Sequence, residues 1–90
     1  MTEVSYDFLE MMARRGLYSS ARRLRFYTSW LFRNADFTGR RVLDVGGGSG
    51  IMTLYAAASG ASTAVCLEPQ GSTINALAAE LGVAHAEQLA

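Results

Sequence analysis

Four glycines within five residues follow a short apolar run that contains a carboxylate. The stretch from Val42 to Gly50 reads Val-Leu-Asp-Val-Gly-Gly-Gly-Ser-Gly. Glycine has no Cβ, so a ligand can lie against the backbone and the turn can adopt positive φ. Free amides at the start of a following helix favour polar or anionic groups. Asp44 stands at the strand end where open α/β sheets bind ligands, so its carboxylate could hold an ammonium group.

A second acid ends the next apolar run. Glu68 lies twenty residues after Gly48 and twenty-four after Asp44, at the spacing where an acidic side chain accepts hydrogen bonds from both hydroxyls of a ribose. Without the glycines, Glu68 would be interpreted as a solvent-exposed residue at the end of a strand. One or two glycines would be interpreted as a tight turn between a strand and a helix. Four glycines exceed what a turn needs, so the combination predicts one nucleoside-like ligand framed by two carboxylates.

These motifs resemble the cofactor-binding half of class I S-adenosylmethionine-dependent methyltransferases, over about residues 40 to 82. The resemblance implies that the glycines shape a loop under the methionine part of the cofactor and that Asp44 lies near its amino group. It also implies that Glu68 binds the ribose hydroxyls and that Pro69 flanks the adenine. The cofactor-binding residues expected from the resemblance are Asp44, Gly46, Gly47, Gly48, Gly50, Glu68 and Pro69. It names no catalytic residue, since later loops usually supply the acceptor side.

Asp36-Phe37-Thr38-Gly39, leading into the glycine stretch, is also similar to the small-molecule O-methyltransferases of this class. A small molecule is therefore favoured over RNA or protein as methyl acceptor, although the acceptor itself is unknown. Two other functions stay open. A dinucleotide-binding module of the NAD(P) type needs Gly-x-Gly-x-x-Gly, but Ile51 occupies the last of these positions. The second alternative function is that of a non-catalytic fragment that binds another protein chain.

The helices and strands that must position these residues are predicted from the spacing of apolar residues and from the glycines, prolines and capping residues that end them. Apolar spacing predicts a helix from Val4 to Arg15 and a second from Leu17 to Arg33, with a buried stripe of Leu17, Ala21, Leu24, Tyr27 and Leu31. Buried strands are expected at 41–45 and 63–67, the second stopping at Glu68 before the proline. Helices are expected at 49–59, closed by Gly60, and from a Ser72 cap to Gly82, after which residues 85–90 trail off.

The predicted fold class is therefore α/β, as an incomplete Rossmann-like class I methyltransferase fold. Residues 1–39 form an N-terminal helical segment, and residues 40–90 form a partial S-adenosylmethionine-binding domain with the first β-α-β-α of a parallel sheet. By resemblance, a whole domain would continue with about five more strands and cover the second sheet face. We expect the chain to be a fragment, inactive alone, whose uncovered sheet face supports self-association or binds a completing chain.

Composition limits the remaining possibilities. Ninety residues fit one small domain, and half of them are hydrophobic. All eight arginines lie within residues 1–41 with four of the eight acids, so this part carries +4 and the remainder −4. The single cysteine, Cys66, forms no intramolecular disulfide, and no Cys and His cluster predicts a metal site. No signal peptide or spanning segment is evident, so a cytoplasmic setting without membrane attachment is expected.

Three interpretations apply to the arginines and aromatic residues of the second helix. In the first, the arginines bind phosphates while the aromatic rings stack on bases. In the second, the helix helps to cover the cofactor or to form the acceptor pocket, with Tyr6, Tyr18, Tyr27 and Trp30 as candidates. The helical spacing favours the third, a solvated arginine face with its aromatic stripe buried. Cys66 is expected to be a small core residue, and His85 a surface residue without a catalytic role.

Overall fold

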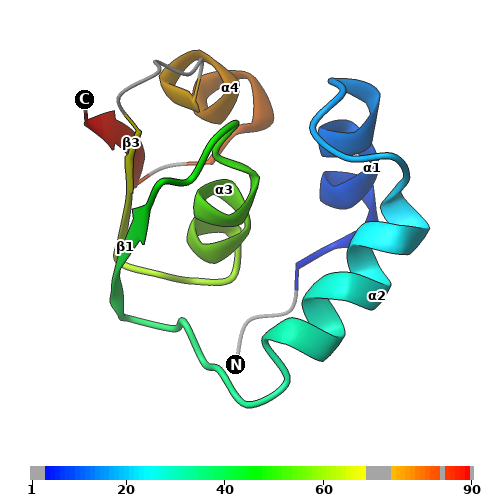
Figure 1. Ribbon diagram of the computed structural model, residues 1–90, viewed down its shortest axis with the longest axis horizontal. Coiled ribbons are helices and arrows are strands. Elements are labelled where there is room, and N and C mark those ends of the chain that lie inside the picture. Colours follow the sequence, from blue (N-terminus) through cyan, green and yellow to red (C-terminus); the bar gives the residue numbers. More distant parts are fainter. Residues whose placement is uncertain (1–3, 69–73, 84, 90) are drawn as a thin grey trace.

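The computed structural model describes residues 4–68, 74–83 and 85–89. Four helices and three strands alternate over most of the chain (Figure 1). In chain order they are α1 (Tyr6–Arg14), α2 (Ala21–Leu31), β1 (Arg41–Val45), α3 (Ile51–Ala58), β2 (Thr63–Leu67), α4 (Ile74–Leu81) and β3 (Ala86–Leu89). The two predicted strands are confirmed at 41–45 and 63–67, but the expectation that the first is buried is wrong, because its residues alternate between exposed and half-buried. The predicted Ser72 cap lies outside the described residues.

The three strands form one parallel sheet in the order β1-β2-β3. Leu43 lies opposite Val65, which in turn lies opposite Glu87. The expectation that residues 85–90 trail off is wrong, because residues 86–89 form β3. Ala86-Glu87-Gln88-Leu89 contains no β-branched or aromatic residue, so its composition gives no strand signal. The free edge of β2 supplies the partners instead, as the Ala64 amide donates to the His85 carbonyl at 2.7 Å.

All four helices lie on the same side of the sheet (Figure 1). α3 packs against β1 and β2, α4 packs against β3, and α1 lies against α2 and α4. Ala64 and Cys66 point to this side and are fully buried, whereas Leu43 and Val45, on the opposite side, are 61% and 70% exposed. Within the described residues, no helix covers that second face. The architecture is α/β and compatible with a partial Rossmann-like fold.

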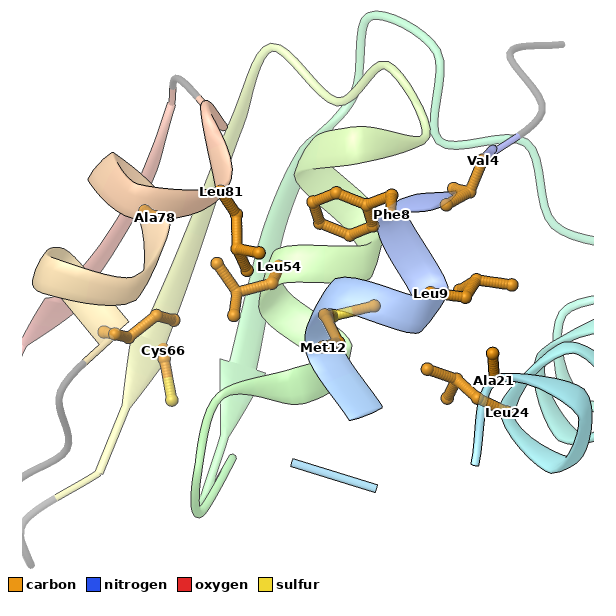
Figure 2. Close-up of a cluster of buried hydrophobic side chains, with 11 residues drawn as sticks. Val4, Phe8, Leu9, Met12, Ala21, Leu24, Leu54, Cys66, Ala78 and Leu81 are labelled. Atoms are coloured by element: carbon orange, nitrogen blue, oxygen red, sulfur yellow. The ribbon is translucent and has the colours of Figure 1, made fainter. Parts of the chain in front are cut away.

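One cluster of buried side chains holds the helices to the sheet (Figure 2). Phe8 on α1 and Leu54 on α3 belong to it together with Leu81 on α4, and Leu24 extends it to α2. The cluster draws on residues from both parts that the sequence predicts, 1–39 and 40–90. Burying a large apolar side chain stabilises a fold by about 1.5–3 kcal/mol, so these contacts hold the helical segment in place.

Serine side chains set where the first two helices begin. Ser5 accepts a hydrogen bond from the Phe8 amide at 3.2 Å, and Ser20 accepts one from the Arg23 amide at 3.1 Å. Each bond satisfies an amide that has no partner within the helix. α2 therefore begins at Ala21, four residues after the predicted start at Leu17.

The buried side of α2 differs from the predicted stripe. Ala21 and Leu24 are buried as expected, but Tyr27 is 41% and Leu31 is 40% exposed. Thr28 takes the buried position in their place, and its hydroxyl donates to the Leu24 carbonyl at 2.8 Å. The hydroxyl can be buried because this bond satisfies it within the helix. The expectation that the aromatic stripe of this helix is buried is therefore wrong.

Candidate functional site

The glycine loop joins the carboxyl end of β1 to the start of α3. The Gly46 amide donates to the Leu67 carbonyl at 2.8 Å, which continues the pairing with β2 one residue past the end of β1. The Gly50 amide donates to the Gly47 carbonyl at 3.0 Å, and the Gly50 carbonyl accepts the first helical bond from Leu54. These bonds tie the loop to the sheet at one end and to the helix at the other.

Two of the glycines are required by close neighbours. A Cβ on Gly47 would stand 2.6 Å from both the Asp44 carboxylate and the Cys66 sulfur. Gly50 has a φ of +85°, and a Cβ there would stand 2.6 Å from the Ile74 side chain. A side chain at either position would push the loop away from the sheet or from α4. Because these two residues have no side chain, the loop can pack closely against the strand ends.

Asp44 points to the helix-covered side of β1, where it is half-buried. Its Oδ2 accepts a hydrogen bond from the Thr53 hydroxyl at 2.9 Å, and Thr53 is fully buried on α3. Among the described residues, the other carboxylate oxygen has no hydrogen-bond partner. Thr53 therefore fixes the carboxylate and leaves one oxygen for a ligand. Sequence reasoning missed Thr53, although it stands nine residues after Asp44 in the first turn of α3.

Glu68 follows β2 directly and is only 9% exposed. Its Oε1 accepts a hydrogen bond from the Gly48 amide at 3.1 Å. A charged acceptor bonded to a backbone amide makes a stronger bond than a neutral one, so this contact holds the middle of the loop against the end of β2. The structure thus brings the glycine loop and the two carboxylates together, as the sequence spacing predicts.

The arrangement combines two anionic side chains with a backbone that a ligand can approach closely. Gly46 and Gly48 both have positive φ, and a Cβ on either would meet nothing within 4 Å, so this side of the loop is open. A ligand that carries both an ammonium group and vicinal hydroxyls suits two carboxylates, whereas a pyrophosphate would be repelled by them. Pro69, the remaining predicted site residue, lies outside the described residues.

The two other reactive side chains are placed as the sequence predicts. Cys66 is fully buried in the core, and His85 is exposed beside β3. The described residues contain no group of three His, Cys, Asp or Glu side chains that could hold a metal ion. No helix among them is long and apolar enough to cross a membrane.

The comparison with curated proteins finds a partial similarity to a methyltransferase. A stretch of 43 residues, 48% of this chain, is 42% identical to "Probable histone-arginine methyltransferase 1.3" of Arabidopsis thaliana. The stretch amounts to 8% of that protein, so this chain spans only a small part of its length. No family model and no solved structure matches the chain. The similarity points to a methyltransferase in general terms.

Proposed function

We propose that this chain is the S-adenosylmethionine-binding part of a class I methyltransferase. The observation that carries the proposal is the hydrogen bond from the Gly48 amide to Glu68, at 3.1 Å, beside the Asp44 carboxylate. This bond holds the glycine loop at Glu68, and both acids lie at the carboxyl ends of two adjacent parallel strands, where α/β sheets bind nucleotide-like ligands. The partial similarity to a histone-arginine methyltransferase supports the same class of cofactor.

Each carboxylate has its own part in this proposal. Asp44, held by Thr53, attracts the ammonium group of the methionine part through its second oxygen. Glu68 accepts hydrogen bonds from the ribose hydroxyls, and Pro69 flanks the adenine. The bound cofactor supplies an electrophilic methyl group on a sulfonium. The acceptor is proposed to be a small molecule, and the groups that would align it with the methyl are expected from a continuing or completing chain.

Calorimetric titration of the purified chain with S-adenosylhomocysteine tests the proposal, with NAD as the control ligand. We expect saturable binding of S-adenosylhomocysteine and none of NAD. Asp44→Asn and Glu68→Gln keep the shape of each side chain but remove its charge, so each should weaken binding by about tenfold or more. Glu87→Gln, on the exposed face of β3, is the matched control and should leave the affinity unchanged.

Tighter binding of NAD than of S-adenosylhomocysteine would contradict the proposal and favour the dinucleotide alternative. A chain that is folded by circular dichroism but binds neither ligand would contradict both and favour an interaction fragment. Even with the cofactor bound, we expect no methyl transfer by the isolated chain.

A further inference from the structure

The outward side of α2 carries aromatic rings that the fold does not bury. Phe26 is 75% exposed, Trp30 is 59% exposed and Tyr27 is 41% exposed. α2 lies on the far side of the molecule from the sheet (Figure 1). Its inward side is already occupied by the buried residues Ala21, Leu24 and Thr28. Large exposed apolar groups gathered on one surface indicate a binding site.

Arginines lie in the same rows as these rings. Arg22, Phe26 and Trp30 follow one another at four-residue spacing, so they form a line along α2 with successive residues about 6 Å apart. Arg33 ends the line, with its guanidinium 4.7 Å from the centre of the Trp30 ring. Arg23 and Tyr27 form a second, parallel row. We call these residues the α2 outer face: Arg22, Arg23, Phe26, Tyr27, Trp30 and Arg33.

The charge of this region has one sign. From Met11 to Ala35 there are six arginines and no acid. Arg14 and Arg15 pair with Glu10 and Glu80, outside α2. Within the part of the chain that the structure describes, Arg22 and Arg23 have no ion-pair partner.

These two arginines line a surface hollow of about 550 Å³, where the rings of Tyr18 and Tyr27 stack with centroids 6.2 Å apart. Its lining combines cationic guanidinium groups with flat, accessible rings. The hollow is therefore complementary to a ligand that has both negative charge and aromatic surface.

We propose that the α2 outer face binds single-stranded nucleic acid, separately from the cofactor site. Unpaired guanidinium groups attract phosphates, and exposed rings stack on unpaired bases, which is how proteins hold single strands without reading their sequence. A duplex keeps its bases stacked on one another and would leave the rings unused. A membrane-surface helix would separate its rings from its charges on opposite faces, whereas here both kinds share one row.

The test is a titration of the full chain with an oligouridylate about twelve nucleotides long, followed by the fluorescence of Trp30, the sole tryptophan. We expect saturable quenching, because a base stacked on the indole ring changes its emission. The affinity should fall steeply as salt concentration rises, since binding of phosphates by arginines releases counterions.

Two variants separate stacking from charge. Phe26→Ala should weaken binding by about tenfold or more, with the salt dependence unchanged. The double variant Arg22→Gln/Arg23→Gln should weaken binding and flatten the logarithmic salt slope by about one for each phosphate that the arginines no longer neutralise. Leu43→Ala and Arg41→Gln are controls on β1, exposed and away from α2, and should change neither. Circular dichroism checks that each variant is folded.

Absence of quenching at low salt would overturn the proposal. So would equal weakening by Phe26→Ala and the control Leu43→Ala. If polyglutamate bound as tightly as the oligonucleotide, the α2 outer face would be a non-specific binding surface for anions. If phosphatidylserine vesicles bound more tightly than the oligonucleotide, the face would be a membrane contact. Either result would overturn the proposal. These outcomes are independent of the proposed cofactor site, because Phe26→Ala should leave S-adenosylhomocysteine binding unchanged.

Discussion

Two residues of the same chemical type, Asp44 and Glu68, are held in different ways. A side-chain hydroxyl from α3 fixes one oxygen of Asp44, whereas a backbone amide of the glycine loop contacts Glu68. The first contact orients a carboxylate, and the second also restrains the loop. Removing Glu68 is therefore expected to alter the position of the loop as well as the charge.

At this residue scale, Gly47→Ala tests how closely the loop must pack. The added methyl would stand 2.6 Å from the Asp44 carboxylate and from the Cys66 sulfur. We expect a loss of roughly 1–3 kcal/mol in the free energy of unfolding, the usual cost of overpacking, together with loss of S-adenosylhomocysteine binding. Urea unfolding and calorimetry measure the two effects. Ser49→Ala, exposed in the same loop, should change neither, and a stable Gly47→Ala that binds normally would contradict the close packing.

At the scale of elements, local chemistry explains the ends of helices better than their buried sides. Ser5 and Ser20 cap α1 and α2 through their hydroxyls. The buried side of α2 depends instead on which residues face α1, so Thr28 is inside while Tyr27 is outside. The exposed rings that result make the α2 outer face available to a ligand.

Ser20→Ala tests the cap of α2. Loss of the hydroxyl leaves the Arg23 amide without its partner, so we expect the free energy of unfolding to fall by about 1 kcal/mol. Chemical denaturation followed by circular dichroism gives this value. Ser19→Ala, one residue earlier and exposed, is the matched control and should lie within about 0.5 kcal/mol of the wild type. Equal losses from the two substitutions would show that Ser20 does not act as a cap.

At the scale of the whole molecule, the core that the described residues form lies on one side of the sheet. Helices cover Ala64 and Cys66, whereas Leu43 and Val45 are exposed on the other face. That a second copy or a completing chain covers this face stays a prediction. The glycine loop lies at the covered side, so its geometry depends on the helices rather than on the exposed face.

Two leucines, one on the covered side of the sheet and one on the exposed side, provide a matched pair of substitutions. Leu54 is fully buried in the cluster of Figure 2, so Leu54→Ala should lower the free energy of unfolding by about 2–5 kcal/mol. Leu43→Ala removes the same atoms from a side chain that is 61% exposed and should cost within about 0.5 kcal/mol. Thermal and urea unfolding at low protein concentration make the comparison. A cost for Leu43→Ala equal to that of Leu54→Ala would mean that its face is covered in solution.

Features whose causes are local could be predicted from the residues alone. Strands at 41–45 and 63–67 follow from apolar runs that end at glycine or at Glu68, and the run of glycines after the first strand predicts the turn between β1 and α3. The meeting of Asp44, the loop and Glu68 was also predictable, because adjacent parallel strands bring their carboxyl ends to one edge.

Features that need a partner from elsewhere in the chain depend on how the elements pack in three dimensions. β3 forms because β2 has a free edge, although its own residues favour no strand. Thr53 became part of the site because α3 packs with its hydroxyl against Asp44. The rings of α2 are exposed because the helix presents Leu24 and Thr28 inward instead. Local patterns predict which residues prefer burial, but packing between elements decides which of them obtain it.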